Sequence, residues 1–449
     1  MSARSTENEP LLLVVSGGVE AVRGLASLKC SGWMLAVLDG DPDAPGFALA
    51  EEVLHASTYD CGAAARAAID LHQRRPIAGV MSIAADVPHT VAHIARTLGL
   101  PRLEAETAAL AMDKLAMKER FARDGVPIPW FETVQGPQDI ERHMGERTLV
   151  LKPVDSRGAR GVLRLDATTD LAWAFEHAHG ESPTGRVMIE EFVAGPQLST
   201  ESMLVGGRAH TCGLSDRNYE LLEQTAPFVI ENGGDQPAEG AADLLKVVDP
   251  VIEAAAASIG LRDGVLKGDL VLANGDEPVV IEVAPRLSGG YFCTDQIPLS
   301  TGVDLVELQA LVAIGAPLDP ELLKPRDWSP TCIRYFFPPV GRLAAVDGFD
   351  EMRSNPWVEH AGLFVQGGDT ISPLTDHTQR AGFVLVTGAT RSLARARAQS
   401  AIDSVQFTLD PNPAAPVAIE QEAADGITTN RSQDSEPRQN TSAVEPGSV

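Results

Sequence analysis

Short apolar segments alternate with helical segments over the first hundred residues, and this alternation restricts the fold more than any other feature. The expected strands are Leu11–Val15, Met34–Leu38 and Gly79–Ile83. The helices expected between and after them are Val19–Lys29, Ala63–Gln73 and Val87–Leu98. Strands that are separated by helices form a parallel sheet with helices packed on its faces. We therefore predict a doubly wound, Rossmann-like α/β domain over residues 10–100.

The middle of the chain follows a different pattern, because its strands come in adjacent pairs. Gly206-Gly207 and Asn274-Gly275 each join two apolar segments, and such dipeptides are typical of tight hairpins. Hairpin strands pair in antiparallel fashion, so we predict an α+β domain over residues 101–325. Within it, Leu149–Pro153 is expected to be a strand that runs into a glycine-containing loop.

The last part of the chain divides into a folded unit and a tail. Strands near Cys332–Phe337 and Phe383–Thr387, with a helix at Ser392–Val405, predict a small α/β unit over residues 326–410. The tail, residues 411–449, has no aromatic residue and is rich in Pro, Ser, Gln, Asn and acids. Such a segment buries too little apolar surface to offset its ordering entropy, so we predict that it is disordered.

Charge and cysteine content exclude several functional classes. The chain has 36 basic and 62 acidic side chains, a net charge of -26, which disfavours a nucleic-acid partner. Its five cysteines are scattered and form no Cys-x-x-Cys pair, which argues against a disulfide framework and a zinc site. The apolar runs are too short to span a membrane. We expect a soluble, cytoplasmic protein that acts on small molecules.

Two lysines and a glycine loop form the first half of a chemical pattern. Lys114 lies early on an expected helix, and Lys152 ends an expected strand just before the loop Ser156–Gly161. Lysine side chains neutralise phosphate groups as point charges. Glycines such as Gly158 and Gly161 let backbone N–H groups approach phosphate oxygens, because no Cβ intervenes. The pattern therefore indicates a triphosphate site.

Two carboxylates and an arginine form the second half of the pattern. Asp269 and Glu282 lie on the two strands of an expected hairpin, and Arg286 follows Glu282 by four residues. Facing carboxylates can hold hard cations between phosphates. An arginine beside them can stabilise the charge that develops when phosphate is transferred.

In this order the groups resemble those of the ATP-grasp superfamily, which includes D-alanine–D-alanine ligases, biotin carboxylase, carbamoyl phosphate synthetase and the L-amino acid ligases. The resemblance covers roughly residues 10–410. It implies a small lobe over residues 115–187 and a large lobe over residues 188–325, closing around ATP and Mg²⁺ or Mn²⁺. Residues 301–306 and the unit after residue 326 resemble the carbamoyl phosphate synthetase and L-amino acid ligase branch.

The resemblance also assigns roles to individual residues. The residues implied to bind the ATP phosphates are Lys114, Lys152, Ser156, Arg157, Gly158 and Gly161. The residues implied to bind adenine and ribose are Glu190, Glu191, Phe192, Val193 and Gln197. Asp269 and Glu282 are the implied metal ligands, and Arg286 and Lys152 are the implied catalytic residues. The residues implied to contact the substrate are Arg217, Arg286, Ser288, Gly289 and Gly290.

Two positions depart from the superfamily's pattern. Many members have an asparagine two residues after the second metal carboxylate, as a third ligand, but this chain has Ala284 there. The number of metal ions therefore stays open. Many members also have a glutamate for the ribose hydroxyls where this chain has Gln197, which forms hydrogen bonds without charge assistance.

The resemblance predicts a ligase that activates a carboxylate, expected to be that of an amino acid, as an acyl phosphate and transfers it to an amine, releasing ADP and phosphate. Activation of bicarbonate or formate is an alternative, and so is a nucleotide-binding regulator without turnover. A nicotinamide-dependent oxidoreductase would use Ser16-Gly17-Gly18, but the third glycine of the dinucleotide motif is missing. His210 and His377 are expected at the surface, and Cys293 near the active loop. A homodimer is also expected, since dimers are common among relatives.

Overall fold

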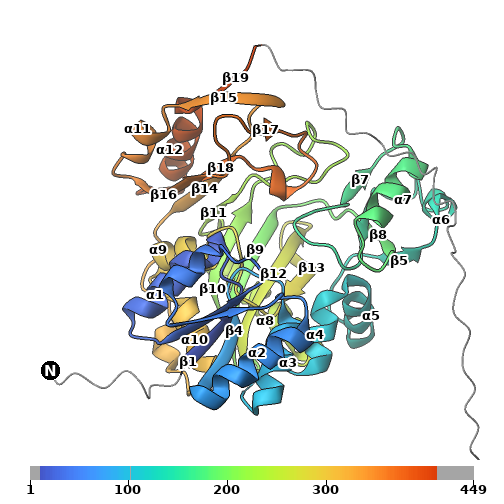
Figure 1. Cartoon of the computed structure of the whole chain (residues 1–449). Helices are drawn as coiled ribbons and strands as arrows, with labels where there is room; N and C mark the ends of the chain where they lie inside the picture. The colour runs from blue at the N-terminus through green and yellow to red at the C-terminus, as the bar shows by residue number, and fades with distance from the viewer. Residues whose placement is uncertain (1–10, 102, 412–449) are drawn as a thin grey trace, which may run out of the picture. The chain divides into compact units, whose positions relative to one another are not determined.

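The computed structural model describes residues 11–101 and 103–411, so nearly all of the tail predicted for residues 411–449 lies outside the described residues (Figure 1). The first sheet is parallel, in the order β3-β2-β1-β4. Its strands are β1 (Leu11–Val15), β2 (Leu35–Asp39), β3 (Glu52–His55) and β4 (Ile77–Ser82). The accompanying helices are α1 (Val22–Cys30), α2 (Cys61–Arg74) and α3 (Pro88–Leu98), with short turns η2 (Val19–Ala21) and η3 (Pro45–Leu49). The predicted parallel sheet is confirmed.

Strand β1 shows why this sheet is covered on both faces. Leu11 and Leu13 pack in one cluster with residues of α2 and α3, whereas Leu12 and Val14 pack in another with α1. The second cluster also includes α10 (Leu305–Ala313), from much later in the chain. Because neighbouring strand residues point to opposite faces, a continuous apolar run such as β1 is buried on both. The first sheet therefore packs directly against the middle of the chain.

The four-stranded second sheet is antiparallel and has the order β5-β8-β6-β7. Its strands are β5 (Phe131–Val134), β6 (Leu149–Pro153), β7 (Leu163–Leu165) and β8 (Val187–Glu191), with helices α6 (Pro137–Glu141) and α7 (Leu171–Gly180). Before it come α4 (Ala105–Met112) and α5 (Lys114–Asp124). Lys114, expected early on a helix, is the first residue of α5, where the carboxylate of the capping residue Asp113 accepts a hydrogen bond from Ala116 N.

The third sheet has eight antiparallel strands in the order β13-β12-β9-β10-β11-β14-β18-β16. Five strands come from the middle of the chain: β9 (Gln197–Val205), β10 (Arg208–Arg217), β11 (Gly234–Gln236), β12 (Gly264–Ala273) and β13 (Glu277–Ala284). Three come from the last part: β14 (Thr331–Phe336), β16 (Val358–Leu363) and β18 (Gly382–Thr387). The C-terminal residues thus extend the sheet of the preceding region, and the predicted domain boundary near residue 325 stays a prediction.

The remaining elements surround this sheet. The helices are α8 (Ala241–Ile259), the π-helical turn η4 (Phe292–Gln296), α9 (Ile297–Thr301), η5 (Pro320–Leu323), α11 (Phe349–Arg353), η6 (His377–Gln379) and α12 (Arg391–Ser404). Strands β15 (Gly341–Asp347), β17 (Thr370–Ile371) and β19 (Gln406–Leu409) form a small separate sheet. None of the helices in the described ranges combines the length and apolarity that a membrane crossing requires.

Candidate active site

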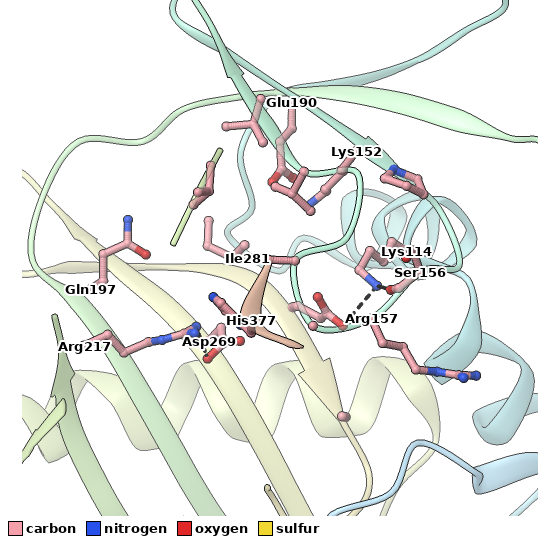
Figure 2. Close-up of a pocket in the computed structure, with 18 of the residues that line it drawn as sticks. Lys114, Lys152, Ser156, Arg157, Glu190, Gln197, Arg217, Asp269, Ile281 and His377 are labelled. Carbon is pink, nitrogen blue, oxygen red and sulfur yellow. Dashed lines mark hydrogen bonds and ion pairs between the residues drawn. The ribbon is translucent and has the colours of Figure 1, made fainter. Parts of the chain in front are cut away.

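A cavity of about 250 Å³ lies between the four-stranded sheet and strands β12 and β13 of the eight-stranded sheet. Figure 2 shows Lys152 and Glu190 on one side of it and Asp269 and Arg217 on the other. The predicted residues that line it are Lys114, Lys152, Ser156, Arg157, Gly158, Glu190, Glu191, Phe192, Val193, Gln197, Arg217, Asp269, Glu282 and Arg286. Groups that are up to 172 positions apart in the sequence (114 to 286) are thereby brought to one cleft.

The two predicted metal carboxylates are direct neighbours in the sheet. Asp269 on β12 pairs with Glu282 on β13 in the antiparallel register. Arg217 Nη1 lies 2.8 Å from Asp269 Oδ1, and Lys267 forms an ion pair with the same oxygen. Glu282 Oε1 lies 3.4 Å from Lys114 Nζ. Burial would raise the pKa of Asp269, but Arg217 and Lys267 lower it far below the usual value, so the carboxylate is ionised.

The donor set at this position fits a hard cation only in part. Two adjacent carboxylates supply the oxygen ligands that Mg²⁺ prefers. Within residues 11–101 and 103–411, no three His, Cys, Asp or Glu side chains are grouped so that they could hold a metal ion. The carboxylates therefore fit an ion that takes most of its ligands from phosphate and water, as Mg²⁺ usually does.

A buried ion-pair triad fixes the side chain of Lys152. Glu190 on β8 forms an ion pair with Lys152 through its Oε1 atom. Its Oε2 atom lies 2.8 Å from Lys118 Nζ. The three side chains are at most 5% exposed. Burial lowers the pKa of Lys118 to about 8 against the opposing attraction of Glu190. The predictions missed Lys118, which follows Lys114 by four residues and so shares a helix face with it.

The glycine loop meets the lysines, but its two glycines differ. Lys114 Nζ donates a hydrogen bond to Ser156 O at 2.7 Å. Gly158 has a φ of +63°, and a Cβ added there would meet no atom within 4 Å. Gly161 has a φ of +71°, but a Cβ there would lie 2.8 Å from Pro153 Cγ. Gly161 does not line the cavity, so the structure places this predicted phosphate-binding residue at a packed turn.

Arg286 is held by the N-terminal sheet domain. Its Nε donates to Asp86 Oδ1 at 2.6 Å, just after β4. Burial would raise the pKa of Asp86, but Arg286, followed by Arg157 and Lys114, lowers it below the usual value. The predictions missed Asp86, because nothing near it in the sequence marks it as an arginine partner.

A second cavity of about 530 Å³ adjoins the first. The residues that line both are Asp86, Gly158, Arg217, Lys267, Arg286 and His377. The predicted substrate residues Ser288, Gly289 and Gly290 line only the second. Arg217 is the last residue of β10. Arg286 therefore lies where a nucleotide cleft and a substrate cavity would meet.

A buried glutamate supports the loop that follows Arg286. Glu201 on β9 is 0% exposed, and it accepts hydrogen bonds from Ser288 N at 2.9 Å and from the Ser288 hydroxyl. Burial raises the pKa of Glu201 to about 7, although Ser288 and Arg286 oppose the shift. Beneath the same loop, Cys293 donates its thiol proton to Ser288 O at 2.9 Å, and burial raises its pKa well above the usual value. Cys293 is thus a packing residue rather than a reactive thiol.

The prediction that His377 lies at the surface is wrong. His377 lines both cavities, and its Nε2 accepts a hydrogen bond from Glu231 N at 3.2 Å. Burial, with the nearby Arg380, lowers the pKa of His377 to about 3, so the ring is neutral. Its backbone N also donates to Gly158 O at 3.1 Å, which joins the C-terminal residues to the glycine loop. Lys267 was also missed, although its spacing of two from Asp269 places both on one strand face.

Comparison with protein families gives two matches. The ATP-grasp domain family matches residues 111–290, and the L-amino acid ligase C-terminal domain 2 family matches residues 334–410. The first match includes Lys114 and extends to Gly290, the last predicted substrate residue.

Curated relatives show similarity over most of the chain. The uncharacterized protein y4rH of Sinorhizobium fredii is 28% identical over 389 residues, covering 84% of this chain and 78% of the relative. D-alanine–D-alanine ligase of Aromatoleum aromaticum is 27% identical, and the match covers 62% of this chain and 86% of the relative. Formate-dependent phosphoribosylglycinamide formyltransferase of Paraburkholderia xenovorans is 25% identical, and the match covers 89% of this chain and 96% of the relative.

Solved structures share the fold. L-amino acid ligase from Bacillus licheniformis superposes with a TM-score of 0.76 at 20% identity, covering 90% of this chain and all of the other. Phosphoribosylglycinamide synthetase from Anaerococcus prevotii superposes with a TM-score of 0.67 at 16% identity, with 89% of this chain covered. At these identities the likeness concerns the fold.

Proposed function

Since the chain belongs to the ATP-grasp superfamily of carboxylate–amine ligases, we propose that it joins the carboxylate of an amino acid to an amine, with release of ADP and phosphate. One observation carries this proposal. Lys152 on the four-stranded sheet and Glu282 on the eight-stranded sheet line one cleft, and Arg286 connects that cleft to a larger second cavity.

In this proposal the nucleotide lies in the first cavity. Lys114, Lys152 and the turn at Ser156–Gly158 bind the phosphates, and the hinge Glu190–Val193 contacts adenine, with Gln197 at the ribose. The ion pair with Glu190 supports the role of Lys152, because it holds the ammonium group in one position before the nucleotide arrives.

Asp269 and Glu282 would hold Mg²⁺, or Mn²⁺, beside the phosphates. When bound, the ion would neutralise charge on the β- and γ-phosphates. Arg217, Lys267 and Lys114 now pair with these two carboxylates. The same cations are therefore well placed to contact phosphate or substrate oxygens once the carboxylates bind a metal.

The reaction has two steps. A carboxylate oxygen attacks the γ-phosphorus of ATP, an O–P bond forms, and the bond to the ADP oxygen breaks with its electrons remaining on ADP. Arg286 stabilises the developing negative charge. The amine nitrogen then attacks the acyl carbon, phosphate leaves with the electron pair of the C–O bond, and the amine loses a proton. Closure of the loop Ser156–Gly161 over the cavity would exclude water, which would otherwise hydrolyse the acyl phosphate.

Activation of formate or bicarbonate is the second candidate, since a formate-dependent formyltransferase is among the relatives. The match of residues 334–410 to the L-amino acid ligase C-terminal domain 2 family favours the first candidate. A regulator without turnover is less well supported, because Lys114, Lys152, Glu282 and Arg286 all line one cleft. The homodimer and the cytoplasmic location stay predictions.

The test is product analysis of the full chain with ATP and Mg²⁺. We expect ADP and a condensed product with a mixture of amino acids, but no ADP with bicarbonate or formate alone. Glu282→Ala should abolish ADP release and leave the melting temperature unchanged. Glu277→Ala, an exposed position on the same strand, is the control. ADP release near the wild-type rate from Glu282→Ala would refute the assigned role.

A further inference from the structure

One wall of the second cavity comes from a rigid turn of the C-terminal residues, η6 and its flanks. Asp376 accepts hydrogen bonds from Thr378 N at 2.8 Å and from the Gln379 side chain. Gln379 in turn accepts from Asp376 N at 2.8 Å, which completes a capping box. His377, Thr378 and Arg380 from this turn line the cavity. The turn therefore holds these side chains in fixed positions.

Arg380 is positioned from two sides and still has an unused donor. Its Nη2 donates to Glu231 O at 2.7 Å, and its guanidinium carbon lies 3.7 Å from the centre of the Tyr335 ring. The side chain is 11% exposed. Among the described residues, its buried Nε has no hydrogen-bond partner. A planar guanidinium with a free N–H group is suited to a carboxylate.

The ion pairs around Arg380 leave one positive charge without a counter-ion. Arg217 pairs with both Glu231 and Asp269, Lys267 pairs with Asp269, and Arg380 pairs with Glu231. This group contains three cations and two anions, none more than 22% exposed. Arg380 has the longest of these contacts, 3.4 Å to Glu231 Oε2. A partly buried excess charge is stabilised by binding an anion.

Among the described residues, the other acids that line the cavity, Asp86 and Glu20, form no ion pair with Arg380. Asp86 pairs with Arg286, and Glu20 accepts a hydrogen bond from Gly290 N at 2.9 Å. Arg286 lines both cavities, whereas Arg380 lines only the second. The reacting carboxylate must lie beside the nucleotide, so Arg380 is free to bind a different group.

We propose that the substrates bring a second, non-reacting carboxylate to this cavity and that Arg380 binds it. This inference rests on the proposed ligase function. The carboxylate has two sources: the amine substrate, if it is an amino acid, or the acidic side chain of the activated substrate. With the first source the product is a dipeptide with a free C-terminus, and with the second it carries the acidic side chain.

The experiment begins with the full-length wild-type chain, ATP, Mg²⁺ and the twenty L-amino acids, and product masses identify the joined pair. Each partner is then replaced in turn by its amide, at the α-carboxylate of the amine substrate or at the side chain of the activated substrate. We expect one replacement to lower product formation at least about tenfold, because a charge-assisted hydrogen bond is lost. The partner that shows the loss identifies the source.

The variant Arg380→Gln should raise the KM of that partner at least about tenfold. We expect kcat and the KM for ATP to stay within about twofold, since Arg380 does not line the first cavity. The preference for acid over amide should also disappear. Arg380→Lys keeps the charge but not the planar stack on Tyr335, and should restore part of the preference. Arg353→Gln, an exposed arginine of the same region, is the control.

The outcomes separate the two proposals. Equal use of acid and amide by the wild type at both positions overturns the role of Arg380 but leaves the ligase function standing. An Arg380→Gln enzyme that still prefers the acid to the amide also overturns the role of Arg380 and leaves the ligase function standing. If Arg380→Gln does not fold, the role of Arg380 is tested by the use of acid against amide in the wild type and in Arg380→Lys. If no amino acid pair yields ADP and product, the proposed function itself fails, and this inference with it.

Discussion

Arg286 Nε lies 2.6 Å from Asp86 Oδ1, although 200 positions separate the two residues. This ion pair joins the first sheet domain to the loop after β13. Arg286 is 17% exposed and Asp86 is 29% exposed. The N-terminal domain therefore orients the arginine to which we assign charge stabilisation.

The variant Asp86→Asn should lower kcat by about tenfold to a hundredfold, because Arg286 loses its anchoring charge and catalysis depends on positioning. The KM for ATP should change less than about twofold. Steady-state kinetics of ADP release test this expectation, with the exposed Asp70→Asn as the control. A loss confined to the KM for ATP would contradict the positioning role.

Lys118→Met should destabilise the protein by about 3 kcal/mol, because it removes one partner of a buried ion-pair triad. Glu190 would keep only Lys152, and the affinity for ATP should fall as that lysine shifts. Chemical denaturation and nucleotide binding measure the two effects. Lys246→Met removes an exposed ion pair with Asp243 and should change stability by less than about 0.5 kcal/mol. Equal stability of the two variants would argue against the triad.

The two loop glycines should respond differently to alanine. Gly158→Ala meets open space and should cost only the left-handed backbone strain, about 1 kcal/mol. Gly161→Ala adds a clash with Pro153 and should cost about 2 kcal/mol or more. Thermal unfolding of both variants tests this order. The reverse order would mean that the turn at Gly161 is looser than the structure indicates.

Glu201 should make stability fall as the pH rises from about 4.5 to about 7. Burial raises its pKa in the folded state to about 7, so over this range the folded protein keeps a proton that the unfolded chain has lost. The difference corresponds to about 3 kcal/mol. Glu201→Gln keeps the shape and an acceptor for Ser288 but cannot titrate. Relative to this variant, the wild type should lose stability across that pH range, and parallel curves would contradict the expectation.

Much of the fold was predictable because it depends on neighbours in the sequence. The all-apolar segment β1 was predicted with its observed bounds, and the dipeptide Gly206-Gly207 was correctly predicted to turn between β9 and β10. Strand β3 was missed, because only Leu54 of its four residues is buried and the strand lies at the sheet edge. An edge strand has no continuous apolar signal.

The sequence by itself determined the order of most elements and most of the predicted residues that line the first cavity, whereas Asp86, Lys267 and His377, which also line it, were missed. Lys152 could be singled out because it ends an apolar strand before a glycine loop, and Asp269 and Glu282 because a hairpin pairs them. These are local relationships, fixed by strand period and turn chemistry.

Only the tertiary structure decided which side chains support that cleft. The pairing of Asp86 with Arg286, the burial of Lys118 and Glu201, and the return of Arg380 to the second cavity all depend on strand order and register. The C-terminal strands join the large sheet beside β11, which no local pattern specifies. Contacts between residues that are far apart in the sequence leave no periodic pattern in it. The residues around one partner do not indicate which distant residue it will contact.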